Sequence, residues 1–229
     1  MSGERDFAAV VFDYGGVLTG PVHESISGWL TAERLDRESF SGTLREWLSR
    51  DAPDGTPIHR LETGELPVES FNEIFAARLR TADGGPVDPD RLLDRMFAGM
   101  KLDPAMVELV EALQRNGIRV ALLSNSWGNS YPRDWIDRVF DPVVISGEIG
   151  MRKPHPAIFE HTLGLLGLPA ARVVFVDDAE PNVLGARRSG LTAIQHAGPE
   201  STAAALGGLF PGPGLRAPLA RSGPILPAV

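Results

Sequence analysis

The chain has 229 residues, of which 43% are hydrophobic and 23% charged, which is ordinary for a globular protein with one large core or a core plus a smaller domain. The net charge of −8 argues against a nucleic-acid-binding protein, and the lack of cysteine excludes disulfides, thiol catalysis and thiolate metal sites. No apolar run approaches the ~18 residues of a membrane span, and the polar N-terminus lacks a signal-peptide core, so a cytoplasmic protein with no membrane partner is expected.

The first predicted element is a buried strand close to the N-terminus. An apolar run over residues 8–12 is followed by Asp13, and two glycines, Gly15 and Gly16, come soon after. This pattern indicates a strand of a parallel sheet with a carboxylate at its C-terminal tip. Ligands bind at that edge of open α/β sheets, so Asp13 is the first candidate site residue.

A helical segment follows over residues 20–101. Apolar side chains recur at helical spacing, for example Phe40, Leu44, Trp47 and Leu48, and glycines and prolines separate the helices. The apolar spacing favours Trp29 and Trp47 as core residues. His23 and His59 are candidates to face a substrate.

From Asp103 onwards, helices and strands alternate. Asp103 is a suitable N-cap and Pro104 a suitable first helical residue. The expected strands cover residues 119–123, 143–145, 173–176 and 192–194, with helices between them. This alternation predicts a parallel sheet with right-handed crossovers. After about residue 198 the chain is rich in Gly, Pro and Ala, which predicts a tail without regular structure.

Polar residues follow the later strands as well. The hydroxyl of Ser124 and the backbone N–H groups beside Asn125 can hold phosphate oxygens, although a Ser-Asn helix cap has the same chemistry. Lys153 precedes a proline and can neutralise both a phosphate and Asp13.

Two adjacent carboxylates, Asp177 and Asp178, follow a buried apolar run. Such a pair repels and desolvates badly unless a cation joins the two groups, and Mg²⁺ prefers hard oxygen ligands. Four residues after the pair comes Asn182, which either hydrogen-bonds to this loop or caps the following helix.

Three segments carry a resemblance to a known family: Leu123-Ser124-Asn125-Ser126-Trp127, Gly150-Met151-Arg152-Lys153-Pro154-His155-Pro156 and Val176-Asp177-Asp178. Together with the Asp13 loop, and in this order just after strands, they resemble the haloacid dehalogenase superfamily over about residues 7–197. Within it, the chain looks similar to the N-terminal phosphatase domain of soluble epoxide hydrolase and to small bacterial sugar-phosphate phosphatases.

The resemblance implies a Rossmann-like three-layer α/β core (7–19 and 102–197), a helical cap (20–101) and a Gly/Pro-rich tail (198–229). It implies hydrolysis of a small phosphorylated metabolite by a monomer or homodimer, through an aspartyl-phosphate at Asp13. Lys153 would assist catalysis and bind phosphate together with Ser124 and Asn125. The implied Mg²⁺ ligands are Asp13, Asp178 and the carbonyl of Gly15, with Asp177 supporting them.

The chain departs from the family pattern at Gly15, where most phosphatase members carry a general acid–base aspartate. General acid–base help is typically worth ~10²–10⁴ in rate, so a slow enzyme is expected unless the leaving group is good or a residue such as His23 substitutes. An anomeric sugar phosphate would be such a leaving group. Two other functions stay open: a metal-independent dehalogenase forming an ester of Asp13, and a catalytically weak binding or regulatory protein.

Overall fold

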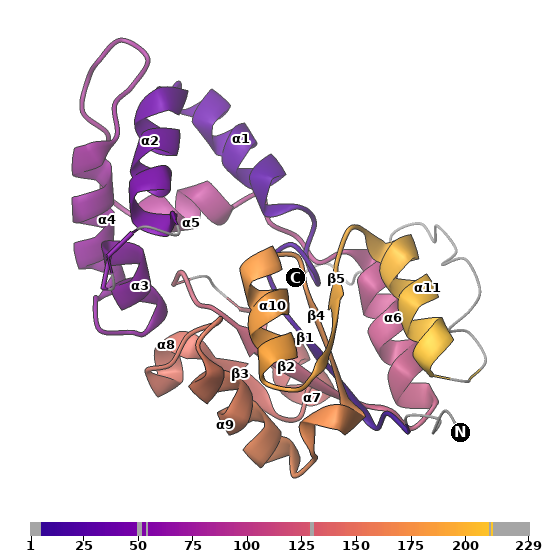
Figure 1. The fold of residues 1–229 in the computed structure, drawn as a ribbon. Helices are drawn as coiled ribbons and strands as arrows, with labels where there is room; N and C mark the ends of the chain where they lie inside the picture. Colours follow the sequence, from indigo (N-terminus) through magenta and orange to yellow (C-terminus); the bar gives the residue numbers. More distant parts are fainter. Residues whose placement is uncertain (1–5, 50–51, 54, 129–130, 211, 213–229) are drawn as a thin grey trace.

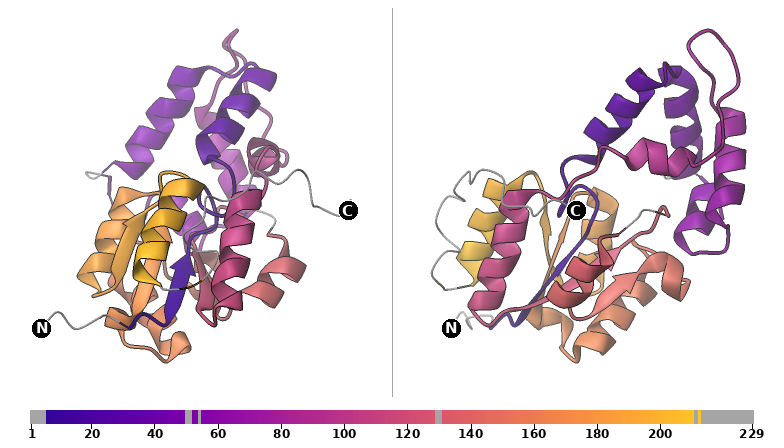
Figure 2. Two further views of the ribbon diagram at one scale, coloured as in Figure 1. Left: turned by 90° about the vertical axis from the view of Figure 1, so that its right-hand side faces the viewer. Right: turned by 180° about the vertical axis from the view of Figure 1, so that it is seen from behind.

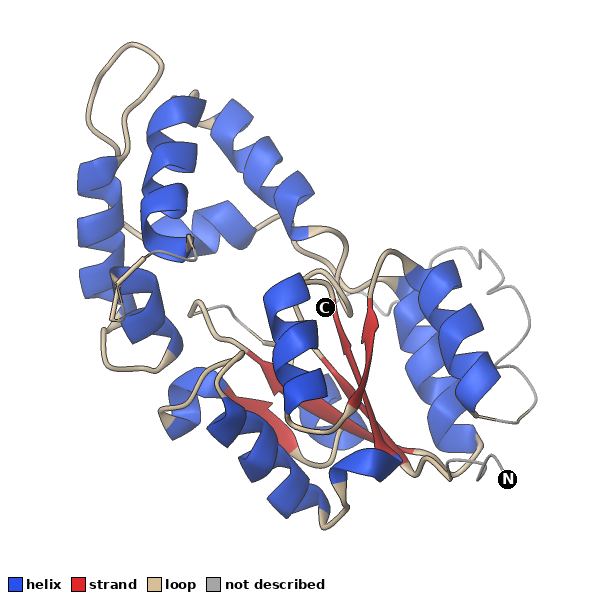
Figure 3. Ribbon diagram, in the orientation of Figure 1, coloured by secondary structure: helices blue, strands red, loops and turns tan. Residues whose placement is uncertain are grey.

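The computed structural model describes residues 6–49, 52–53, 55–128, 131–210 and 212. A 5-stranded parallel sheet with the strand order β3-β2-β1-β4-β5 forms the centre of the molecule (Figures 1 and 3). Its strands are β1 (Ala9–Phe12), β2 (Arg119–Ser124), β3 (Val143–Ile145), β4 (Val173–Asp177) and β5 (Thr192–Gln195). The predicted α/β fold is confirmed, and each expected strand agrees with the observed one to within a residue at its ends.

The order of the strands determines where the site forms. The apolar strand β1 is central and fully buried, and its last residue, Phe12, lies opposite Leu122 of β2 and Val176 of β4. The next residue, Asp13, donates its backbone N–H to the carbonyl of Val176 at 2.9 Å. Asp13 therefore lies between the tips of the two strands whose loops carry the other polar residues.

Helices cover both faces of this sheet (Figures 1 and 2). Val10 and Phe12 point to the face covered by α6 (Pro104–Arg115), α7 (Arg133–Val139) and α11 (Pro199–Leu209). Ala9 and Val11 point to the face covered by α9 (Pro156–Leu166) and α10 (Glu180–Arg188). Two shorter elements, α8 (Ser146–Ile149) and the 3-10 helix η1 (Ala170–Arg172), complete the core. In the described part of the chain, no helix is long and apolar enough to cross a membrane.

The expectation of an irregular tail after residue 198 is wrong for residues 199–209, which form α11. Ala203 and Leu206 of this helix, and Phe210 after it, lie in the hydrophobic core, and Phe210 packs against Phe7. Burial of these apolar side chains outweighs the weak helix propensity of the glycines in the segment. The Pro-rich stretch from residue 213 lies outside the described residues.

The segment 20–101 is helical, as expected. It contains α1 (Val22–Ala32), α2 (Arg37–Leu48), α3 (Pro57–Glu62), α4 (Val68–Arg78) and α5 (Leu92–Phe97), which surround a hydrophobic core of their own. Trp29 and Trp47 are buried in that core, which confirms their predicted packing role. The Asp36 carboxylate caps α2 by accepting hydrogen bonds from the N–H groups of Glu38 and Ser39.

The chain leaves and re-enters the core at adjacent points. Thr19 forms an isolated bridge with Leu102, and Gly20 N–H donates to the carbonyl of Lys101 at 3.0 Å. We therefore propose a helical cap over residues 20–101, inserted into a core of residues 7–19 and 102–210, which places α11 in the core rather than in a tail.

Candidate active site

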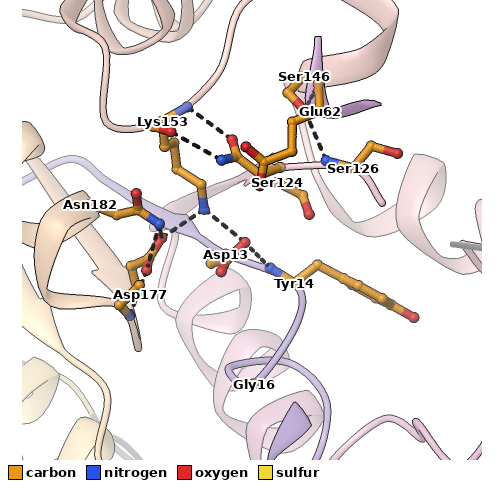
Figure 4. A network of polar contacts seen from close by, with 12 residues as sticks. Asp13, Tyr14, Gly16, Glu62, Ser124, Ser126, Ser146, Lys153, Asp177 and Asn182 are labelled. Atoms are coloured by element: carbon orange, nitrogen blue, oxygen red, sulfur yellow. Dashed lines mark hydrogen bonds and ion pairs between the residues drawn. The ribbon is translucent and has the colours of Figure 1, made fainter. Parts of the chain in front are cut away.

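An ammonium group and two carboxylates meet at the tips of the central strands (Figure 4). Lys153 Nζ lies 2.8 Å from Asp13 Oδ1 and 2.6 Å from Asp177 Oδ2. The side chains of Lys153 and Asp177 are both fully buried. Three residues that the sequence analysis selected from separate segments are thus in direct contact.

The charges at this point do not balance. Oxygens of Asp13, Asp177 and Asp178 all lie within 4.8 Å of one another, so three carboxylates and one ammonium carry a net charge of −2 when ionised. Burial raises the pKa of Asp13 to about 7, against the opposing effect of Lys153. Burial and the neighbouring Asp177 raise the pKa of Asp178 as well. A hard divalent cation such as Mg²⁺ fits these oxygens and would neutralise the excess charge.

Lys153 is held in its charged form by its neighbours. Burial alone lowers the pKa of a lysine, but the carboxylates of Asp13 and Asp177 outweigh this effect and raise the pKa of Lys153 above its usual value. Its ammonium is therefore a fixed positive charge at the bottom of the site. The segment carrying it follows helix α8 rather than a strand, which corrects the expectation that every motif comes directly after a strand.

Gly16 allows the loops after β1 and β4 to approach each other. It has a φ of +75°, and a Cβ atom built there would lie 2.5 Å from Asp178 Oδ2. Glycine is therefore required both for the left-handed backbone and for the space that the Asp178 carboxylate occupies.

Both carboxylate oxygens of Asp177 accept hydrogen bonds from other residues of the chain. Its Oδ1 accepts hydrogen bonds from Ala179 N–H at 2.9 Å and from Asn182 Nδ2 at 3.1 Å, while Oδ2 faces Lys153. Of the two alternatives for Asn182, the structure supports the hydrogen bond to this loop. These contacts occupy the buried Asp177 carboxylate, whereas Asp178 is more accessible.

Asn125 has a contact that the sequence analysis missed. Its side-chain amide donates to the carbonyl of Lys153 at 3.1 Å and accepts from the N–H of the same residue at 2.9 Å. The Asn125 side chain thus holds the main chain of Lys153. The hydroxyl of Ser124 lies 3.0 Å from that of Tyr131, a second residue that the sequence analysis did not select.

Glu62 of α3 joins the cap to the core. Its Oε1 accepts a hydrogen bond from Trp127 Nε1 at 2.8 Å, and its Oε2 pairs with Arg152 Nε. The backbone carbonyl of Glu62 accepts from Ser146 Oγ (Figure 4). The role of Glu62 depends on tertiary contacts, and no local sequence signal identifies it. We call Glu62 and its three partners, Trp127, Arg152 and Ser146, the cap–core contact.

Replacing Glu62 with alanine should loosen the cap. The change leaves Arg152 without its buried partner, and because Arg152 is partly exposed we expect a cost below the ~3–5 kcal/mol typical of a broken buried pair. The midpoint of thermal unfolding should fall and KM should rise more than kcat falls. Glu65→Ala, which removes an exposed cap carboxylate, is the matched control. An unchanged melting temperature and KM for Glu62→Ala would show that these contacts do not hold the cap.

A cavity of about 190 Å³ lies above Asp13, between the core and the cap. Its polar lining includes Asp13, Ser124, Asn125, Lys153, Asp178 and Asn182, and its remaining lining is Gly15, Val22, Ile26, Glu62, Phe97, Met100, Trp127 and Ala179. Neither histidine selected from the sequence lines it. His23 is exposed on α1, and His59 lines a different cavity of about 410 Å³.

Gly15 stands where most phosphatases of the family that the chain resembles carry an aspartate, and its backbone would accept a larger residue. Gly15 does not share the left-handed conformation of Gly16, and a Cβ atom built on it would make an ordinary contact of 3.5 Å with Val22 Cγ2. The loop therefore has room for a Cβ atom at residue 15.

Comparison with known proteins agrees with this geometry. Residues 7–190 match the family model for haloacid dehalogenase-like hydrolases. The mouse acyl-CoA dehydrogenase family member 10 is 28% identical over 87% of this chain and 19% of its own length. Bifunctional epoxide hydrolase 2 from Sus scrofa is 27% identical over 81% of this chain and 36% of its own length. The chain thus spans about a fifth and about a third of these two relatives.

A solved structure has a similar fold. It is a haloacid dehalogenase family enzyme from Bacteroides thetaiotaomicron, in complex with magnesium and inorganic phosphate, with a TM-score of 0.56 and 21% identity. The similarity covers 82% of this chain and 93% of that chain. The family match, together with the sheet order and the inserted helices, leads to one conclusion: this chain belongs to the haloacid dehalogenase-like hydrolase family.

Proposed function

We propose that the protein is a Mg²⁺-dependent phosphatase that hydrolyses a small phosphate monoester through an aspartyl-phosphate at Asp13. The observation that carries the proposal is the group of three carboxylates around the buried ammonium of Lys153. A divalent cation would offset the excess negative charge, and the cation together with the Lys153 ammonium would then provide the positive charge that a phosphoryl group needs.

In the first step, a carboxylate oxygen of Asp13 attacks phosphorus, and the bond from phosphorus to the leaving oxygen breaks. Tyr14 N–H and Lys153 Nζ both donate to Asp13 Oδ1, at 2.7 and 2.8 Å, and so fix the orientation of the carboxylate. Lys153, the hydroxyl of Ser124 and the backbone N–H of Asn125 would hold the phosphoryl oxygens. In the second step, water hydrolyses the aspartyl-phosphate and releases inorganic phosphate.

The metal would be held by Asp13, Asp178 and the carbonyl of Gly15. When bound there, Mg²⁺ would supply positive charge to the phosphoryl oxygens, while Asp177 keeps Lys153 and Asn182 in place. The family member crystallised with magnesium and inorganic phosphate supports this choice of ion.

The dehalogenase alternative has less support. An ester of Asp13 formed by displacement of a halide needs no metal, and it leaves the Asp178 carboxylate, which lies close to Asp13 and Asp177, without an explanation. The binding-protein alternative rests on Gly15 alone, since every other group that the proposed first step needs is present at the site.

Removing the metal site should stop phosphate release. Asp178→Asn removes one anionic ligand, and since a catalytic metal is worth several kcal/mol of transition-state stabilisation, we expect activity to fall by about 10³-fold. The measurement is phosphate release from an aryl phosphate with and without Mg²⁺. Asp134→Asn, at an exposed position of α7, is the control. Phosphate release that persists in a chelator would contradict the metal requirement.

A further inference from the structure

Two chemically different groups of residues line the cavity above Asp13. Carboxylates, Lys153 and hydrogen-bonding groups at the strand tips suit a phosphoryl group and a cation. The apolar part of the lining consists mainly of the side chains of Val22, Ile26, Phe97, Met100 and Trp127. We infer that the organic group of the substrate is compact and apolar, an aryl or hydrocarbon group rather than a sugar; this inference rests on the proposed phosphatase function.

The apolar wall comes from the segments that connect the cap to the core. Val22 and Ile26 lie one turn apart on α1, where the chain enters the cap, while Phe97 ends α5 and Met100 follows it, where the chain returns. Trp127, in the loop after β2, stacks edge-on against Phe97 with ring centroids 6.1 Å apart. All five side chains are partly exposed, so they present apolar surface to a molecule bound in the cavity.

Among the described residues that line the cavity, the one polar cap side chain is Glu62, and both of its carboxylate oxygens already accept a hydrogen bond from the core. Each of its carboxylate oxygens accepts from a core residue, Trp127 on one side and Arg152 on the other. The indole N–H of Trp127 is donated to the same carboxylate. A sugar hydroxyl placed against this wall would lose its hydrogen bonds to water without replacement.

Because Gly15 has no side chain, an apolar group is uncovered beside the position from which the leaving oxygen would depart. With no side chain at residue 15, the Cγ2 methyl of Val22 faces the space where a carboxylate could stand. The wall that contacts the organic group therefore begins beside the scissile bond. The cavity has a volume of about 190 Å³ and also receives the phosphoryl group, which favours a compact organic group.

Two esters of similar size test this inference. Benzyl phosphate and glucose 6-phosphate both release a primary alcohol, so they differ mainly in the polarity of the organic group. Because a single methylene in an apolar pocket changes kcat/KM by ~10–200-fold, we expect benzyl phosphate to be preferred by at least about 100-fold. Equal or better turnover of glucose 6-phosphate would overturn the inference and leave the proposed phosphatase function intact.

Variants of the wall give a second test. Ile26→Asn and the nearly isosteric Val22→Thr should each lower kcat/KM for benzyl phosphate by about tenfold or more, and change it much less for glucose 6-phosphate. Ile74→Asn, at a position of α4 that is 38% exposed, is the matched control and should leave both values unchanged. Equal losses on both esters in a folded Val22→Thr protein would contradict the inference.

A binding measurement separates this inference from the proposed function. If neither ester nor an aryl phosphate releases phosphate with Mg²⁺, the proposed function has failed; in either case, calorimetry with benzylphosphonate and methylphosphonate tests the cavity directly. Tighter binding of benzylphosphonate by about tenfold or more supports an apolar subsite. Equal binding of the two phosphonates overturns it.

Discussion

Replacing Asp13 with asparagine should reduce phosphate release by about 10⁴-fold or more, because the amide has the shape of the carboxylate without its nucleophilicity. Lys153 keeps its contact with Asp177 in this variant, so the phosphate-binding end of the cavity should remain formed. Binding of inorganic phosphate measured by calorimetry should therefore persist. Turnover near that of the wild type would place the nucleophile elsewhere.

The same variant should change how stability depends on pH. In the metal-free protein, burial raises the pKa of Asp13 from 3.8 to about 7. As pH rises through this range the unfolded chain loses the proton first, so the free energy of unfolding should fall between pH 4 and 7. Asp13→Asn should make this fall smaller, and Mg²⁺ should offset it in the wild type. Thermal melts at several pH values measure the effect, and identical pH profiles of the two metal-free proteins would contradict this account of Asp13.

Replacing Gly15 with aspartate should raise activity on alkyl phosphates by up to ~10²–10⁴-fold, the usual contribution of general acid–base catalysis. The substitution is sterically reasonable, since residue 15 is not left-handed and its Cβ would meet Val22 at an ordinary distance. The new carboxyl would protonate the leaving oxygen, so the dependence of rate on leaving-group pKa should become shallower.

Gly15→Asn is the matched control, because asparagine fills the same space without a transferable proton. It should leave the leaving-group dependence of the wild type unchanged. A wild-type protein that already shows a shallow dependence would mean that another residue supplies the proton, and the account of Gly15 would then be wrong.

The strands and the polar residues at their tips were predictable because their signals are local. A continuous apolar run such as residues 173–176 indicates a buried strand wherever it folds, and a carboxylate that ends such a run must lie at the edge of the sheet. Parallel strands place both tips at the same edge of the sheet, but the adjacency of β1 and β4, which brings Asp13 and Asp177 together, was not predicted from the sequence.

The residues that face the substrate from the cap were harder to predict. The sequence analysis selected His23 for its chemistry, whereas the helical phase of α1 turns Val22 and Ile26 to the cavity and leaves His23 exposed. The i, i+4 spacing of those two apolar residues was a usable signal. The contacts of Glu62 and Asn125 depend on how cap and core dock, which no local pattern encodes.

Helix α11 was not predicted, because the prediction for the chain after residue 198 relied on its amino-acid composition. Glycine and proline are common after residue 198, but Ala203 and Leu206 lie on one face of the helix and reach the core. Tertiary burial thus decided the structure of a segment whose intrinsic propensity is weak.

The central claim is that a phosphoryl group passes through Asp13, and trapping the intermediate tests it most directly. Because Gly15 also removes the base for the second step, the aspartyl-phosphate should hydrolyse slowly and accumulate in a single turnover with an aryl phosphate and Mg²⁺. After an acid quench, mass spectrometry should find one phosphoryl group on the peptide containing Asp13, and none in the Asp13→Asn protein or without metal. Release of phosphate while that peptide stays unmodified throughout the turnover, or an organic ester on Asp13, would contradict the account.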